Sequence, residues 1–274
     1  MGLINNIKSE AKGNGTKIQS SDAAALEKIL NRMFYLPKDV KGEAAFVEQV
    51  MTRGLESTER VGLHASALIV SDNKFCLRQQ VLSLMYKQLQ GEQMSVGLKR
   101  IFEEGNAIHE KWQRLFLRAG YSKVEDLDVT QFNKKYRVSF TPDIICRIPE
   151  FYDGDMIGEI KSVNTFQFQK MHKHPSASKQ AQWYMYLTGL QKCFVLSEDK
   201  NTQDIKLEIY DFDPDVVAPF IKRCEEVKAA YKRAHTEGKM VSRPADAKDP
   251  ECRRCHDCPM REACWNIGKG KVRL

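Results

Sequence analysis

The sequence lacks any run of 18 apolar residues, the length that a helix needs to cross a bilayer. Its first residues, MGLINNIKSEAKGNG, do not contain the apolar stretch of a secretory signal, and Asn6 does not fit the pattern for myristoylation. No segment fits the phosphate-binding pattern GxxxxGK(S/T), so the chain is not expected to drive work with ATP. Internal repeats and low-complexity segments are also missing. We therefore expect a cytoplasmic globular protein that has no membrane partner.

Positive charge is only mildly in excess. The chain has 43 Lys and Arg residues and 36 Asp and Glu residues, which gives a net charge of +7. A balance of this size is compatible with a polyanionic partner but does not require one. Hydrophobic residues make up 42% of the chain, which suffices for a sizeable core. A length of 274 residues allows one large domain, or one domain with appendages.

Hydrophobic periodicity predicts a series of helices and strands that follows a loose polar arm over residues 1–20. The predicted helices are 20–34, 42–55, 76–88, 95–120, 176–190 and 214–238. The predicted strands are 134–148, 155–163, 192–200 and 205–213, with a turn in PEFYDGD between the first two. This order predicts an α/β or α+β sheet with a helical N-terminal side.

Two carboxylates and a lysine stand out on the first two predicted strands. Asp143 follows Pro142, and Glu159 and Lys161 are two apart on the next strand, so their side chains point to the same face. A hairpin would bring Asp143 beside them. Two carboxylates can hold Mg²⁺ or Mn²⁺, and a lysine can stabilise a phosphate that reacts there. The alternative is that these are ordinary turn and strand charges.

Two helical signals accompany this group. His109 lies on the long predicted helix before the strands, and an imidazole is a suitable third ligand for Mn²⁺. Gln180 and Tyr184 are i, i+4 on a later helix, so they share one face and could brace the lysine and touch DNA. Trp183 and Tyr186 are expected to pack in the core.

In this order, the residues resemble the PD-(D/E)XK nuclease superfamily, and most of all its RecB-type branch, which includes the CRISPR-associated RecB-like exonucleases and the AddB nuclease domain. The resemblance covers residues 76–264 and implies an α/β fold with a restriction-endonuclease-like mixed sheet and flanking helices. The metal ligands it implies are His109, Asp143, Glu159 and the main-chain carbonyl of Ile160. The catalytic residues it implies are Asp143, Glu159, Lys161, Gln180 and Tyr184. We expect a nuclease domain over 71–274 and a helical extension over 1–70.

Four of the eight cysteines lie between positions 252 and 264. In a reducing compartment such clusters more often bind metal than form disulfides. The residues alone allow a zinc site made of Cys252, Cys255, Cys258 and Cys264. The resemblance implies instead a [4Fe–4S] cluster held by Cys76, Cys255, Cys258 and Cys264, which leaves Cys252 over. Cys146, Cys193 and Cys224 lie in apolar segments and are predicted to be buried thiols.

A basic stretch, residues 161–180, begins at Lys161 and contains lysines, histidines and two phenylalanines but no acid. Its lysines could neutralise phosphates, and Phe166 or Phe168 could stack on unpaired bases. The alternative is a solvated basic loop with a buried phenylalanine. Lys200, in the turn EDKNTQ, is a further candidate for a phosphate contact or an ordinary turn lysine.

The resemblance implies a metal-dependent DNA nuclease, with cleavage of single-stranded DNA from free ends in recombination, repair or mobile-element processing. A helicase or recombinase is the partner that such an enzyme would have. One alternative is a structure-selective endonuclease similar to a junction resolvase. Another is a non-catalytic protein that binds DNA ends and carries an iron–sulfur or zinc site.

Overall fold

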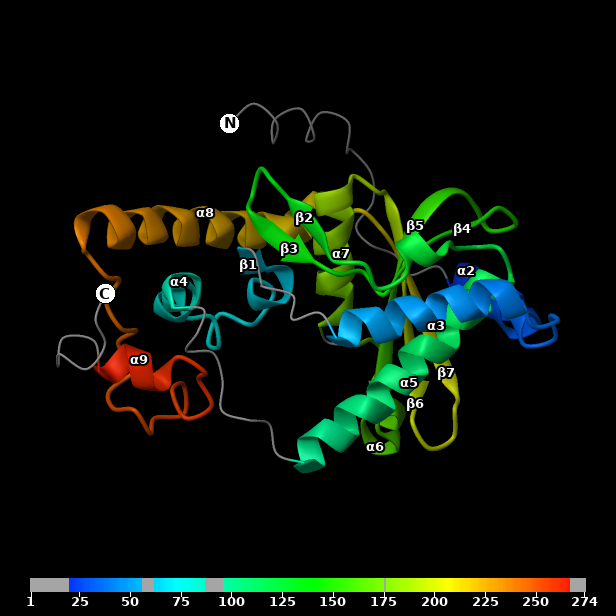
Figure 1. Ribbon diagram of the computed structural model, residues 1–274, viewed down its shortest axis with the longest axis horizontal. Helices are drawn as coiled ribbons and strands as arrows, with labels where there is room; N and C mark the ends of the chain where they lie inside the picture. The colour runs from blue at the N-terminus through cyan, green and yellow to red at the C-terminus, as the bar shows by residue number, and fades with distance from the viewer. Residues whose placement is uncertain (1–19, 56–61, 87–95, 175, 267–274) are drawn as a thin grey trace. The chain divides into compact units, whose positions relative to one another are not determined.

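The computed structural model describes residues 20–55, 62–86, 96–174 and 176–266 (Figure 1). The chain forms two compact units. The first consists of residues 1–59, 101–131 and 140–218, and the second of residues 60–100, 132–139 and 219–274. Among the described residues, no helix is both long and apolar enough to pass through a membrane.

The first unit is built on a mixed sheet of four strands in the order β4-β5-β6-β7. Its strands are β4 (Ile144–Ile148), β5 (Tyr152–Val163), β6 (Lys192–Asp199) and β7 (Ile205–Asp211). The outer pairs are antiparallel, and β5 pairs with β6 in parallel. A parallel pair needs a crossover connection, which here contains α6 (Thr165–Lys170) and α7 (Ala177–Thr188).

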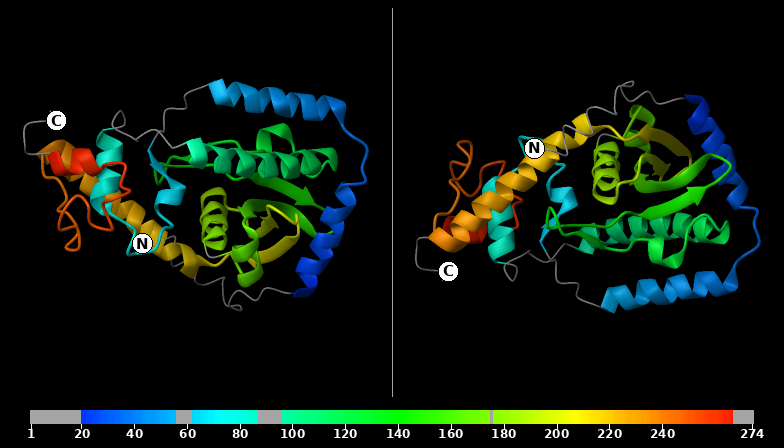
Figure 2. Two further views of the ribbon diagram at one scale, coloured as in Figure 1. Left: turned by 90° about the horizontal axis from the view of Figure 1, so that it is seen from below. Right: turned by 90° about the horizontal axis from the view of Figure 1, so that it is seen from above.

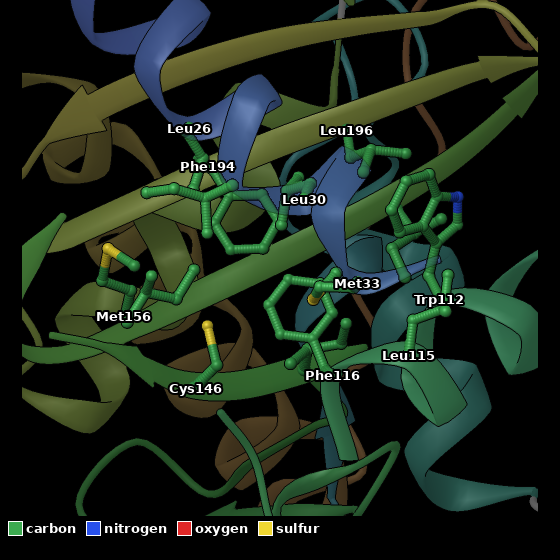
Figure 3. Close-up of a cluster of buried hydrophobic side chains, with 14 of the residues drawn as sticks. Leu26, Leu30, Met33, Trp112, Leu115, Phe116, Cys146, Met156, Phe194 and Leu196 are labelled. Atoms are coloured by element: carbon green, nitrogen blue, oxygen red, sulfur yellow. The ribbon is translucent and has the colours of Figure 1, made fainter. Parts of the chain in front are cut away.

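Helices cover both faces of this sheet. Seen edge-on in Figure 2 (left), α5 (Val96–Arg118) lies along one face and α7 along the other, with α3 (Val40–Leu55) outside α5. The core on the α5 side also takes in α2 (Ser20–Met33), through Leu26, Leu30 and Met33, which recur at helical spacing. Figure 3 shows these side chains facing the strands, where the Phe116 and Phe194 rings stack with 5.7 Å between centroids.

Strand alternation on β5 separates an apolar face from a polar one. Met156 and Ile160 belong to the core on the α5 side, whereas Lys161 contacts α7 on the other side. Gly158 allows the Phe194 ring to pack directly against the strand, because a Cβ at this position would overlap the ring. The strand that carries the candidate site is thus seated on the core by a close aromatic contact.

The described part of the second unit is built mainly from short strands and from helices. The strands are β1 (Leu63–His64), β2 (Gln131–Asn133) and β3 (Val138–Phe140), in the order β1-β3-β2. The helices are α4 (Leu77–Met85), α9 (Arg261–Asn266) and most of α8 (Pro214–Glu237). Leu82 and Tyr86 form a small apolar cluster with Met260 and Ala263, which joins the α4 segment to the C-terminal one.

The predicted α/β fold class, a mixed sheet flanked by helices, is confirmed by the first unit. The predicted helices are present within a few residues of their expected bounds. The expected loose arm over 1–20 lies outside the described residues, apart from Ser20.

One local prediction was wrong. The strand predicted over 134–148 is two strands, β3 and β4, that belong to different sheets. Pro142 lies at the break, and a proline has no N–H to donate to a strand ladder. Within the basic stretch, α6 is capped by Asn164, whose side chain accepts the Gln167 amide at 2.9 Å.

Candidate active site and cysteine pocket

The register of two strands brings the two carboxylates together. Ile144 at the start of β4 is opposite Gly158 of β5, so Asp143 lies next to Glu159. The Ile160 amide donates to Asp143 Oδ2 at 2.7 Å. Glu159 is fully buried and Asp143 is 8% exposed. Burying two neighbouring carboxylates is costly unless charged partners are present.

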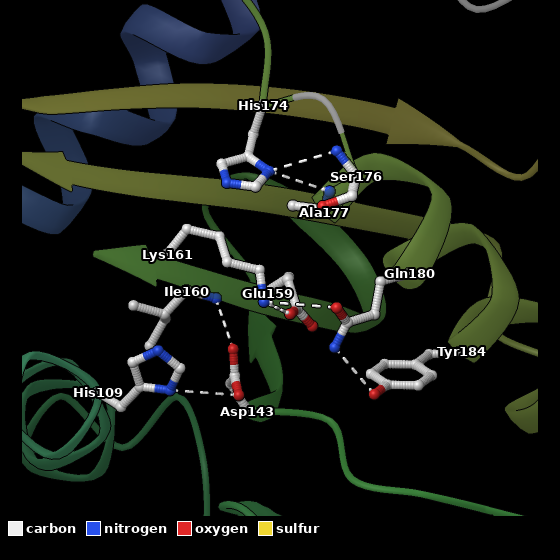
Figure 4. Close-up of polar contacts among 10 residues, drawn as sticks. All are labelled: His109, Asp143, Glu159, Ile160, Lys161, His174, Ser176, Ala177, Gln180 and Tyr184. Carbon is white, nitrogen blue, oxygen red and sulfur yellow. Dashed lines mark hydrogen bonds and ion pairs between the residues drawn. The ribbon is translucent and has the colours of Figure 1, made fainter. Parts of the chain in front are cut away.

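One partner comes from α5 (Figure 4). His109 Nδ1 is 3.3 Å from Asp143 Oδ1. One turn further along α5, the buried Gln113 donates its amide to the carbonyl oxygen of Asp143 at 2.8 Å. Both the side chain and the backbone of Asp143 are therefore fastened to the same helix.

The second partner is on β5 itself. The Lys161 ammonium donates to Glu159 Oε1 and, at 3.4 Å, to Gln180 Oε1 on α7. The Gln180 amide nitrogen in turn donates to the Tyr184 hydroxyl at 2.9 Å, which fixes the orientation of the amide. Figure 4 shows this chain of contacts running from β5 to α7. The structure thus brings His109, Asp143, Glu159, Lys161, Gln180 and Tyr184 into one group.

The charged side chains of this group shift one another's pKa values. Burial alone would raise the pKa of Asp143, but His109 and then Lys161 outweigh it and hold that pKa below its usual value. Burial and the nearby Asp143 raise the pKa of Glu159. Burial opposes the charge of His109 and Lys161, yet the carboxylates prevail and raise both pKa values. The lysine is therefore positively charged at neutral pH.

The chemical types of the donors in this group, though not their present arrangement, are those that a hard divalent cation accepts. Glu159 Oε2 is buried and has no hydrogen-bond partner among the described residues, so one carboxylate oxygen is left for a ligand. Carboxylate oxygens with one imidazole are ligands that Mg²⁺ and Mn²⁺ accept. Because Lys161 already holds the other Glu159 oxygen, it also limits how the carboxylate can turn toward an ion.

A second candidate site lies in the second unit. Cys76, Cys255, Cys258 and Cys264 line one pocket, and Cys252 does not. Successive tight turns present the C-terminal cysteines, since the Cys255 amide donates to the Cys252 carbonyl at 2.8 Å and the Cys258 amide to the Cys255 carbonyl at 3.0 Å. Four arginines line the same pocket: Arg78, Arg243, Arg254 and Arg261. The pocket therefore combines thiols with positive charge.

One arginine contacts a cysteine directly. Arg78 is 8% exposed, and its Nε donates to Cys264 Sγ at 3.2 Å. Burial raises the pKa of Cys258, and the nearby Cys76 and Cys264 add to the effect. Among the residues that the structure describes, no three His, Cys, Asp or Glu side chains are arranged so that they could hold a metal ion. The ligand sets at both sites stay predictions.

The remaining sequence predictions concern cysteines and aromatics. Cys146, Cys193 and Cys224 are buried, as predicted. Phe168 is 7% exposed and packs inward, whereas Phe166 is 66% exposed, with the Lys170 ammonium 3.7 Å from its ring centroid. Only Phe166 is thus open to a ligand.

Lys200 forms an ion pair, because its ammonium lies 3.6 Å from the Glu104 carboxylate. Sequence reasoning missed His174, which lies near Lys161. Lys161 and Glu208 lie far from it in the sequence, and the motif HKHP gave no signal for either contact.

No protein-family model matches the sequence, and no curated protein matches it either. Several solved structures are similar in fold, among them SSO0001 and LHK-Exo. SSO0001 has 14% identity over 80% of this chain and 93% of its own, with a TM-score of 0.45. LHK-Exo in complex with dAMP has 16% identity over 66% and 95%, with a TM-score of 0.48.

A third structure is the alkaline exonuclease LHK-Exo from Laribacter hongkongensis, with 14% identity over 65% of this chain and 93% of its own and a TM-score of 0.45. With such identities and TM-scores, nothing about activity is transferred from these proteins to this chain.

Proposed function

We propose that this protein is a metal-dependent deoxyribonuclease of the PD-(D/E)XK type. The observation that carries the proposal is the meeting of Asp143 and Glu159 beside a charged Lys161, with one buried Glu159 oxygen left without a partner. An unpaired buried oxygen is costly, and a bound cation would remove that cost. His109 completes the set from α5.

The residues that would hold the cation are His109, Asp143, Glu159 and the carbonyl of Ile160. When bound, a divalent cation supplies Lewis-acid polarisation of a phosphate oxygen and activation of water. Lys161 is held in its charged form by the two carboxylates, so it acts as a donor to phosphate oxygen and not as a general base. Gln180 orients the ammonium, and Tyr184 orients Gln180.

Single-stranded DNA with a free end is the substrate that we propose. α6 follows β5 directly, so the exposed Phe166 lies close along the chain to Lys161 and presents an aromatic face next to Lys170. Aromatic rings beside positive charges are how proteins bind unpaired bases without reading sequence. Double-stranded DNA keeps its bases stacked and would not use this ring.

The cysteine pocket is proposed to hold a [4Fe–4S] cluster through Cys76, Cys255, Cys258 and Cys264. All four line one pocket, and the arginines there would offset the negative charge of a thiolate-bound cluster. The cluster would join the C-terminal segment to the start of α4. It would thereby close a long loop of the chain and stabilise the folded state. A zinc site that uses Cys252 in place of Cys76 is the alternative.

The test is digestion of single-stranded DNA labelled separately at each end, with anaerobically purified protein and Mg²⁺ or Mn²⁺. We expect metal-dependent loss of the label, and no cutting by Lys161→Ala although DNA is still bound. Lys192→Ala is the matched control, because that lysine lies at the other end of the sheet, paired with Asp211. Cutting by Lys161→Ala would reject the mechanism.

Two further substrates separate the alternatives. Closed circular and branched DNA should survive, because neither offers the free single-stranded end that the proposal requires. Cleavage of these substrates, with linear strands left intact, would instead indicate a structure-selective endonuclease. Binding of DNA ends without any cutting would indicate a non-catalytic protein.

A further inference from the structure

His174 is held rigidly between α6 and α7, close to Lys161. Its backbone amide donates to Glu208 Oε1 at 2.7 Å, and Glu208 is a buried residue of β7. Its ring is attached to the start of α7, where Nδ1 accepts the Ala177 amide at 3.1 Å and the Ser176 amide at 3.4 Å. Both the backbone and the ring are therefore fixed in place before any ligand arrives.

These contacts decide which ring nitrogen carries the proton. A nitrogen that accepts hydrogen bonds cannot itself be protonated, so the proton of the neutral ring is on Nε2. Burial, and then the positive charge of Lys161, lower the pKa of His174 to about 4, which keeps the ring neutral at physiological pH. The result is a single, fixed N–H donor.

That donor lies on the lysine side of the site. Figure 4 shows His174 on the same side of β5 as Lys161, with the nitrogen that is not bonded to α7 turned toward the lysine side chain. His174 is half-buried. The hydrogen bonds of its ring among the described residues are those from the two α7 amides. An ammonium group cannot accept a hydrogen bond, so Lys161 does not satisfy this N–H.

We propose that His174 Nε2–H donates a hydrogen bond to a non-bridging phosphate oxygen of the nucleic acid bound at Lys161. The inference rests on the proposed nuclease function and adds a substrate-contacting residue to it. The Lys161 charge attracts the phosphate, and the fixed imidazole adds a directional donor beside that charge. A donor held in place beforehand stabilises developing charge without reorganisation, which is the property that transition-state stabilisation requires.

The competing explanation is that His174 only caps α7, and two substitutions separate the roles. In His174→Asn the side-chain oxygen can take the place of Nδ1 and accept the α7 amides, but no donor reaches the position of Nε2. In His174→Gln the amide nitrogen can reach the position of Nε2, but the acceptor for α7 is lost. The two variants thus remove one function each.

We expect His174→Asn to cut single-stranded DNA roughly 100-fold more slowly, with an unchanged unfolding midpoint. His174→Gln should keep most of the activity and lose about 2–4 °C in midpoint. The reverse pattern, an active Asn variant and an inactive Gln variant, would show that His174 acts only as a cap. If the wild-type protein cuts no DNA, the proposed nuclease function itself is wrong.

Two readouts besides the rate test the contact. Nitrogen NMR of the ring should give the Nε2–H form, and an Nδ1–H form contradicts the inference whether or not the protein is a nuclease. Substrates with one non-bridging oxygen replaced by sulfur should slow the wild type for one of the two stereoisomers, since sulfur accepts hydrogen bonds poorly. His174→Asn should lose that sensitivity, and equal sensitivity in both proteins would overturn the proposed contact.

Discussion

The Ile160 amide donates a 2.7 Å hydrogen bond to the Asp143 carboxylate, across two strands that pair from Ile144 and Gly158 onward. His109 and Lys161, with this bond, hold the pKa of the buried Asp143 below its usual value and leave it ionised. Asp143→Asn retains an oxygen that can accept from the Ile160 amide but removes the negative charge. We expect its metal-dependent cleavage to fall about 1,000-fold or more, because metal-assisted chemistry depends on that charge.

Two measurements test Asp143→Asn: its cleavage rate, and the unfolding curve of the metal-free protein. A folded but inactive variant, whose melting temperature no longer rises with Mn²⁺, is the expected result. Normal activity in this variant would place the reacting centre elsewhere.

Metal affinity should rise with pH. His109 and Glu159 both have raised pKa values, so each tends to hold a proton that a metal ion must displace. Asp143 is already ionised and adds no pH dependence. The dissociation constant for Mn²⁺ should therefore fall from pH 6 to pH 8, by roughly tenfold per pH unit for each proton released.

Calorimetry in buffers of different ionisation enthalpy counts those protons directly. Binding that releases none, with the same affinity at pH 6 and pH 8, would exclude His109 and Glu159 as ligands. Glu159→Gln is the matched variant and should weaken binding at every pH.

Gly158 is needed for packing and not for chain flexibility. A methyl group in Gly158→Ala would overlap the Phe194 ring, and overpacking of a core costs about 1–3 kcal/mol. Gly97→Ala in α5 is the control, because nothing lies within 4 Å of a Cβ there. The urea midpoint should fall for the first and stay or rise for the second. Equal midpoints would contradict the packing of Phe194 on β5.

The two candidate ligand sets of the cysteine pocket predict different effects for substitutions of Cys76 and Cys252. Cys76→Ser should lose iron and its visible absorption, because Cys76 lines the pocket, whereas Cys252→Ser should keep both. Iron and zinc content after anaerobic purification is the measurement. Zinc without iron, retained in Cys76→Ser and lost in Cys252→Ser, would favour the local zinc site.

Local patterns predicted the elements well, and the non-local pairings had to come from the structure. The i, i+4 spacing of Leu26 and Leu30 predicts the buried face of α2, and alternation puts Glu159 and Lys161 on one face of β5. Neither pattern reveals the β4–β5 register that brings Asp143 to Glu159. His174 was missed because its anchor, Glu208, is on a strand far along the chain.

Residues 20–55 illustrate the same limit. They belong to the helical extension that is predicted over 1–70 because the resemblance does not cover it. In the structure, Leu30 of α2 and Phe46 of α3 pack in the same core as Trp112 of α5. Amphipathic periodicity shows that a helix has a buried face, but not against which element that face packs.

Phe166 and Phe168 offer a matched pair for the DNA-binding prediction. Both are in α6 and have a lysine over the ring, but Phe166 is 66% exposed and Phe168 is 7% exposed. Phe166→Ala should therefore weaken single-stranded DNA binding by about 1–3 kcal/mol and leave the unfolding free energy unchanged. Phe168→Ala should instead lower the unfolding free energy by about 3–5 kcal/mol, since a buried ring is lost. Fluorescence anisotropy with a labelled oligonucleotide measures the binding, and urea unfolding measures the stability.

If Phe166→Ala bound single strands as tightly as the wild type, the proposed aromatic contact would be wrong. The lysines alone would then account for binding, and the affinity would depend steeply on salt.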